Sequence, residues 1–335
     1  MGGNDELLER LFKAHSNDFA SFDTKYPDHF VCPICYEIFP HEGINSGTLS
    51  VGHIWPDAIR KKSGAEIIKR QIVMLCKECN NNAGRRGDNQ MQLREISKDE
   101  EKKGVLFGER RVEIIPGLPE KPIELHAQLK LNQGDEVQGK IVFTLDNAKK
   151  WARNNPKERD RFEALSKEKP FSMIVYPFHK IKPFLSEVGW ITSAYLLAFY
   201  TFGYRYICNP DLNRVREYIT HSFTDKPDPP PKDEDFKIQE CSSHSFQEPQ
   251  IGLVIPLDGK TPVHIEISLF DYHIRLPFHH YNQPILAVLI QRNEEISKNM
   301  EKLTNEGAKL FVKVDCTKMD SHDCIWDYVL GKLVH

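Results

Sequence analysis

The sequence predicts an α+β protein in two parts, a small cysteine-rich module followed by a larger mixed α/β domain with antiparallel strands. Two C-x-x-C pairs, at 32–35 and 76–79, indicate a segment that is held together by metal. Apolar and polar residues alternate from position 105 onward and are divided by Pro-Gly and Asn-Gln-Gly-Asp turns, which predicts antiparallel strands. A length of 335 residues accommodates two such domains.

The first residues are expected to form an amphipathic helix that docks on the module. Apolar side chains recur there at close to helical spacing, at Leu7, Leu8, Leu11, Phe12, Phe19 and Phe22. The chain begins with acidic residues where a signal peptide needs basic ones, and no apolar run follows. A cytoplasmic protein is therefore expected.

The charged run Ser97–Gly104 predicts a boundary between a module at 1–100 and a second domain at 105–335. The apolar run Val188–Ile207 carries Thr and Arg side chains, so a buried core helix is favoured over a membrane span, and no membrane partner is expected. This domain is expected to select a target, sense a signal or assemble with a second copy or another protein. Its expected parts are strand-rich 105–145, helical 146–222, a mobile Pro- and charge-rich loop at 224–235 and strand-rich 250–292.

The two C-x-x-C pairs have the spacing of a structural zinc site. A two-residue spacer lets both thiolates of a pair reach the same tetrahedral ion. Eight cysteines in a chain expected to be cytoplasmic are not expected to form a disulfide framework. The predicted zinc ligands are Cys32, Cys35, Cys76 and Cys79.

The segment between and just after these pairs carries a second motif. It contains VGHIWP at 51–56 and LCKECNN at 75–81, and a glycine and an aspartate follow at Gly84 and Asp88. This order resembles the four-cysteine zinc-containing subgroup of the HNH (ββα-metal, or His-Me finger) endonucleases. The resemblance covers residues 30–90 and implies a two-stranded hairpin with a helix against it, around a catalytic divalent metal that is separate from the zinc.

The resemblance also implies a role for individual residues. His53 matches the general base, whose neutral imidazole takes a proton from the attacking water. Asn80 matches a ligand of the catalytic Mg²⁺ or Mn²⁺, cations that prefer oxygen donors. Asp88 is a second candidate ligand, because it follows Asn80 by two helical turns on the same face. Gln71 stands where many members have an Asn that orients the imidazole.

Gly52 departs from the family pattern, because members usually have an acidic or histidine metal ligand immediately before the general base. The alternatives for the missing ligand are Asp57, Glu42, His41 or a phosphate oxygen of the substrate, and the residues do not decide among them. The alternative function is a catalytically decayed HNH zinc module that acts as a DNA-binding or regulatory protein.

A local basic window is the expected contact with nucleic acid. The chain has a formal net charge of −3, whereas positions 60–94 hold nine basic and three acidic residues. Such a window is typical of phosphate contacts that release counterions, although a solvated face is the alternative. The expected substrate is DNA, with RNA left open, and the expected setting is restriction or anti-phage defence. The expected contact residues are Lys61, Lys62, Lys69, Arg70, Arg85 and Arg86.

Overall fold

The computed structural model divides the chain into two compact units, residues 1–91 with 183–335 and residues 92–182. The division differs from the expected boundary near Ser97–Gly104, because the helices and strands after residue 183 belong to the same unit as the cysteine-rich segment. Residues 225–235 and 279–292 of the expected second domain lie outside the described residues. The structure describes 3–103, 105–115, 123–132, 139–142, 156–157, 160, 172–175, 183–224, 236–241, 245–256, 262–278 and 309–314.

The unit formed by residues 92–182 contains an antiparallel sheet with the strand order β7-β6-β5-β8. The central pair is long, and its ladder runs from Val105 opposite Asn132 to Ile114 opposite Ile123. These pairs confirm the antiparallel strands that the alternation in the sequence predicted for this region. Their bounds are β5 (Val105–Ile115), β6 (Ile123–Asn132), β7 (Gly139–Val142) and β8 (Ser172–Val175).

The cysteine-rich segment is built from short elements around two hairpins, β1 with β2 and β3 with β4. The expected amphipathic helix is present and buries Leu8, Leu11, Phe12 and Phe19. The elements are α1 (Gly3–Phe22), β1 (His29–Val31), β2 (Ile38–Pro40), η1 (His41–Gly43), β3 (Leu49–His53), α2 (Asp57–Ser63), α3 (Glu66–Arg70), β4 (Ile72–Cys76), α4 (Lys77–Asn82), a π-helical turn η2 (Ala83–Asp88) and α5 (Asn89–Lys103).

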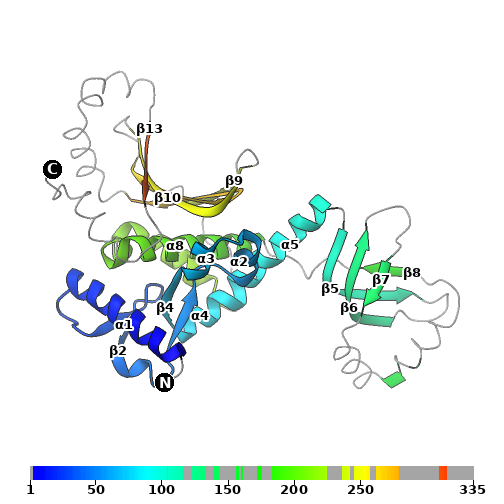
Figure 1. The fold of residues 1–335 in the computed structure, drawn as a ribbon, viewed down its shortest axis with the longest axis horizontal. Coiled ribbons are helices and arrows are strands. Elements are labelled where there is room, and N and C mark those ends of the chain that lie inside the picture. The colour runs from blue at the N-terminus through cyan, green and yellow to red at the C-terminus, as the bar shows by residue number, and fades with distance from the viewer. Residues whose placement is uncertain are drawn as a thin grey trace. The chain divides into compact units, whose positions relative to one another are not determined.

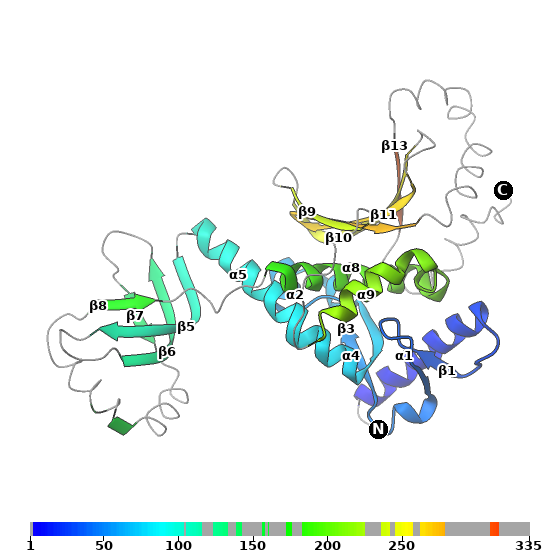
Figure 2. The ribbon, with the colours of Figure 1, turned by 180° about the vertical axis from the view of Figure 1, so that it is seen from behind.

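Helix α8 (Pro183–Ile207) forms the centre of the core of the larger unit. Figure 1 shows α8 between a sheet and the cysteine-rich segment, and Figure 2 shows the same arrangement from behind. Nearly all of its residues are buried, as expected for a helix that is apolar on every side. The Trp190 ring lies 4.0 Å from the Tyr272 ring on the sheet and 6.3 Å from the Trp55 ring below it. None of the helices in the described ranges is long and apolar enough to cross a membrane.

The sheet over α8 has the order β13-β10-β11-β12-β9, and each neighbouring pair is antiparallel. In β11 and β12 apolar positions alternate with polar ones and are buried, as at Ile265 and Ile267 of β11. The Tyr206 hydroxyl of α8 donates to the carbonyl of Pro277 at 2.9 Å. The remaining bounds are η3 (Pro210–Leu212), α9 (Asn213–His221), β9 (Lys237–Glu240), β10 (Phe246–Pro256), β11 (His264–Phe270), β12 (Tyr272–Pro277) and β13 (Lys309–Val314).

Helix α8 crosses η2 with the two backbones in direct contact at Gly189 and Gly87. A Cβ on Gly189 would lie 2.8 Å from the carbonyl oxygen of Gly87, and a Cβ on Gly87 would lie 3.0 Å from the Cα of Gly189. Both neighbours are backbone atoms, so neither can turn away as a side chain can. The crossing therefore sets the position of the helical segment that begins with α4.

We expect Gly189→Ala to destabilise the protein by about 1–3 kcal/mol, the usual cost of overpacking a tight core. Alanine otherwise stabilises a helix interior by about 0.5–1 kcal/mol relative to glycine, so a loss of stability isolates the steric effect. Gly84→Ala in η2 is the matched control, because the nearest atom to its Cβ is Asp88 Oδ2 at 3.9 Å. Urea unfolding, monitored by tryptophan fluorescence, gives the free energy of unfolding of both variants. Equal values for the two variants would contradict the close backbone contact at Gly189.

Candidate metal centre and active site

The four predicted cysteines form a cluster whose sulfur atoms all lie within 4.8 Å of one another. Cys32 and Cys35 lie in the turn after β1, Cys76 ends β4 and Cys79 lies in α4. The Sγ atoms of Cys35 and Cys76 are 3.8 Å apart. A tetrahedron with Zn–S bonds of about 2.3 Å has sulfur–sulfur edges of about 3.8 Å, and an all-thiol donor set suits a soft ion. The cluster can therefore hold a metal ion such as zinc.

Local backbone bonds shape both cysteine pairs. The N–H of Cys32 donates to the carbonyl of Glu37, and the N–H of Tyr36 donates to the carbonyl of Cys32, both at 2.9 Å. Tyr36 has a φ of 61°, so the chain reverses there in a left-handed turn. The N–H of Cys79 donates to Cys76 Sγ at 3.3 Å, which caps α4. Burial raises the pKa of the Cys32 thiol well above its usual value, and a bound cation offsets this by stabilising the thiolate.

Tyrosine hydroxyls connect the first cysteine pair to α8. The hydroxyl of Tyr195 donates to the carbonyl of Pro33 at 2.6 Å, across 162 residues of sequence. The Tyr204 hydroxyl donates to the carbonyl of Val31. In the opposite direction, the Tyr36 hydroxyl donates to the last carbonyl of α8. The cysteine cluster is thus supported by a helix from the other half of the chain.

A hairpin with a helix against it presents the residues of the second motif. The β3–β4 register pairs Gly52 with Val73, and alternation places Ser50 and Gly52 on the face toward α4. Asn80 of α4 donates through Nδ2 to Ser50 Oγ and to the carbonyl of Val51, both at 3.1 Å. Its Oδ1 lies 3.3 Å from the place that a Cβ on Gly52 would take. Position 52 and Asn80 therefore lie side by side.

His53 is exposed at the end of β3 and lies beside a guanidinium group. Arg60 of α2 places Nη1 3.3 Å from His53 Nδ1 and is itself paired with Asp57. Because arginine can only donate, Nδ1 is the acceptor and the proton of the neutral ring is on Nε2. Partial burial and then the charge of Arg60 lower the pKa of His53 below its usual value, while Asp57 acts in the opposite direction. Both effects favour the neutral form of the imidazole.

Arg60 is a residue of interest that the motif did not single out. It lies seven positions after His53 and is the first residue of the basic window. The sequence therefore indicated a positive charge here but not its contact with His53. Its contact with the imidazole depends on the turn of β3 into α2, which the sequence does not specify.

Gln71 and Asp88 occupy different environments from His53. Gln71 is buried, and its Oε1 accepts a hydrogen bond from the Trp55 indole at 2.7 Å. Asp88 lies in η2, where burial raises the pKa of its carboxyl to about 7. Among the described residues, the four cysteines are the one group of three or more Cys, His, Asp or Glu side chains that can hold a metal. The polar atom nearest to a Cβ at position 52 is Asn80 Oδ1, at 3.3 Å.

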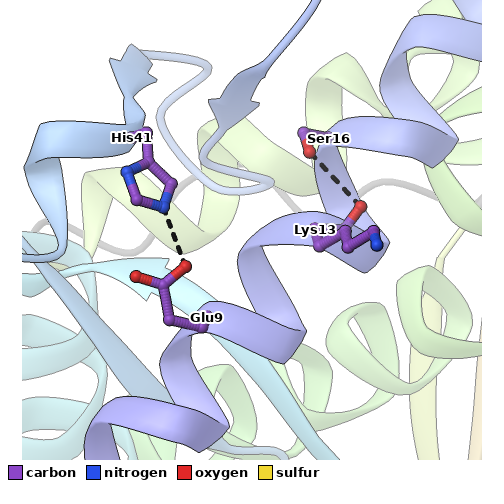
Figure 3. A network of polar contacts seen from close by, with 4 residues as sticks. All are labelled: Glu9, Lys13, Ser16 and His41. Atoms are coloured by element: carbon purple, nitrogen blue, oxygen red, sulfur yellow. Dashed lines mark hydrogen bonds and ion pairs between the residues drawn. The ribbon is translucent and has the colours of Figure 1, made fainter. Parts of the chain in front are cut away.

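The three side chains considered for the missing ligand are placed as follows. His41 bonds through Nε2 to Glu9 Oε2 of α1 at 2.8 Å, as Figure 3 shows together with the neighbouring bond from Ser16 to the carbonyl of Lys13. Asp57 is paired with Arg60, and Glu42 is exposed at the surface. The existing partners of His41 and Asp57 compete with any metal.

The residues of the predicted basic contact differ in their surroundings. Arg86 donates to the carbonyls of Ser222 and Thr224, which follow α9. It therefore fixes the backbone just after the C-terminus of that helix. Lys62 lies over the Phe270 ring at 5.1 Å. The exposed members are Lys61, Lys69, Arg70 and Arg85. These four are available to solvent, whereas Arg86 has a structural contact.

Comparison with known proteins found no match to a protein-family model, to a curated protein or to a solved structure. The functional interpretation therefore rests on the residues and their geometry.

We expect one tightly bound zinc per chain, and we expect Cys76→Ser to lose it. Cys76 ends β4 and caps α4, so the strand and the helix should separate when its thiolate is removed. Cys241→Ser is the matched control, because this partly buried cysteine lies outside the cluster. Metal analysis and circular dichroism measure the two variants. Full zinc content and native stability in Cys76→Ser would contradict the assignment.

Proposed function

We propose that the chain is a metal-dependent endonuclease of the HNH type that hydrolyses phosphodiester bonds in DNA, with His53 as general base and Asn80 as metal ligand. The observation that carries the proposal is the contact between position 52 and Asn80 on one face of the hairpin, next to His53. In the family that the motif resembles, the strand residue before the general base and a helix residue together hold the metal. Both positions meet here, although one of them is a glycine.

Asn80 Oδ1 would hold a Mg²⁺ or Mn²⁺ ion, and the remaining ligands would be water and phosphate oxygens, as is common for Mg²⁺. When bound, such an ion stabilises the charge on the scissile phosphate and on the leaving oxygen. The two bonds from Asn80 Nδ2 to β3 keep the amide oxygen turned toward position 52. The side chain thus needs no rearrangement to present its oxygen.

His53 would act on the attacking water and Arg60 on the phosphate that the water attacks. The guanidinium of Arg60 can bind a phosphate oxygen by charge-assisted hydrogen bonds, and Asp57 holds it in place. Nδ1 of His53 accepts from this guanidinium, so Arg60 would turn from Nδ1 to a bound phosphate, and the lone pair of Nδ1 would then be free for the attacking water beside that phosphate. Gly52 and His53 are consecutive at the end of β3 but point to opposite faces, so the scissile phosphate would have to lie across the end of the strand to meet both His53 and the space beside Gly52.

A decayed HNH module that binds DNA or regulates another process is the second candidate. It is favoured by Gly52, which offers no ligand, and by the lack of a carboxylate or histidine cluster at this site among the described residues. Mg²⁺- or Mn²⁺-dependent nicking of a supercoiled plasmid distinguishes the two candidates.

We expect His53→Ala to reduce the rate of plasmid nicking by about 10²-fold or more, because a general base contributes about 10²–10⁴-fold. Zinc content and DNA affinity should stay unchanged. His221→Ala is the matched control, since His221 is exposed at the end of α9 and outside the hairpin. The proposed mechanism is wrong if His53→Ala nicks DNA as fast as the unchanged protein.

The pH dependence provides a second measurement on the same group. A base must be unprotonated, so the rate should fall as the pH falls through the pKa of His53, which is lowered by partial burial and by Arg60. The acid limb should therefore lie below pH 6.5, the usual pKa of histidine. Arg60→Gln removes a neighbouring positive charge and should move this limb to higher pH. The other charged groups near His53 are Asp57, Lys69 and Lys77. An unmoved limb would contradict the assignment.

We expect Gly52→Asp to lower the concentration of Mn²⁺ needed for half-maximal nicking, because it adds a carboxylate beside Asn80 Oδ1. A Cβ at this position would lie 2.6 Å from Leu75 Cδ1, so the variant should be made with and without Leu75→Ala. Leu75→Ala alone is the control for repacking. If the unmodified protein does not nick DNA and the Gly52→Asp variant does, the chain is a decayed nuclease.

A further inference from the structure

A cavity of about 690 Å³ lies on the face of the β3–β4 hairpin that carries His53. This volume is within the range of small-ligand sites, about 300–1,000 Å³. The cavity is bounded by the first turns of α1 and by both strands of the hairpin, and His53 forms part of its wall. It is therefore a ligand-sized space next to the proposed general base.

The floor of this cavity is apolar. Leu49 and Val51 share the face of β3 that carries His53, and Ile72 is paired directly with His53 on β4. Leu8 closes the floor from α1. Val51 and Ile72 remain partly exposed, so a flat apolar group can reach them from solvent.

Two exposed lysines, Lys69 and Lys77, line the cavity, and no carboxylate of the described part of the chain does so. Lys69 is paired with Glu66 at 2.5 Å, but both side chains are exposed, and such surface pairs are easily exchanged for another anion. Within the described ranges, Lys77 has no ion-pair partner. An apolar floor under two cations matches a ligand with a flat apolar part and a negative charge.

We propose that this cavity binds one nucleotide of the substrate strand, with its base on the apolar floor and its phosphate at Lys69 and Lys77. This inference rests on the proposed function, because it places the adjoining phosphodiester at His53. Both faces of a base are stacked in a duplex, so the occupant is a single-stranded or flipped nucleotide. The cavity thereby gives the site a preference for unpaired or locally opened nucleic acid.

Binding of dAMP by isothermal titration calorimetry, with no added divalent metal, tests the proposal in the full chain. We expect dAMP to bind at least tenfold more tightly than deoxyadenosine or inorganic phosphate. Lys77→Gln should weaken dAMP by about tenfold or more, the effect of losing one charge-assisted hydrogen bond. Val51→Phe should abolish binding by filling the cavity. Lys13→Gln, an equal charge change on an exposed residue of α1 outside the cavity, should change nothing.

Unchanged dAMP binding in both Lys77→Gln and Val51→Phe, with zinc content intact, would overturn the proposal. Equal affinity for dAMP and inorganic phosphate would overturn it too, and so would displacement of dAMP by an equal concentration of hexaglutamate. The outcome is separate from that of the proposed function. If the chain nicks no DNA but binds dAMP with the expected dependence on Lys77 and Val51, the nuclease proposal fails and the cavity assignment stands. If the chain nicks DNA but does not bind dAMP in this way, the cavity assignment fails and the nuclease proposal stands.

Discussion

The convergence of four thiols on one point is the constraint on which the rest of the site depends. Cys76 is at once the last residue of β4, the N-cap of α4 and a member of the cluster. A metal bound at this point would therefore fix the angle at which the helix leaves the strand. Asn80 is the next residue after the last cysteine, so its contact with β3 follows from that angle. A zinc ion held by the four cysteines would thus position the helix against the hairpin.

The cysteine cluster is not the only support of this segment, because its hairpins are short and its buried residues share one core with α8. Helix α8 adds the missing apolar surface, and its tyrosines bond to the backbone around Cys32 and Cys35. At the other end, the Gly87–Gly189 crossing sets the position of the turn that follows α4. The cysteine cluster and the residues after Asn80 are thus held against the same helix from two sides.

The sequence predicted those parts of the site whose signal is local. The spacing of the cysteines, the helix at the N-terminus and the largely apolar run at 188–207 each depend on nearby residues, and the structure confirms them as a cluster, α1 and α8. Contacts between distant segments could not be predicted in this way. Arg86 looked like a phosphate contact because its charge is visible, whereas the carbonyls of Ser222 and Thr224 that it binds are 136 and 138 residues away. Residues 183–335 belong to the same unit as 1–91 through such contacts between distant segments, which the sequence could not predict either.

The electrostatics of the proposed site differ from those of a site built on carboxylates. Asn80 is neutral, position 52 has no side chain, and the charged groups near His53 are mainly cationic: Arg60, Lys69 and Lys77. Asp88 does not supply a full charge at pH 7, because burial raises its pKa to about 7. In the proposed function, the negative charge that attracts a divalent cation must come chiefly from the phosphates of the nucleic acid. Metal and nucleic acid would then each raise the affinity of the other by the same factor, since such coupling is reciprocal. A glycine at the ligand position is compatible with catalysis under this arrangement, in which the substrate completes the metal site.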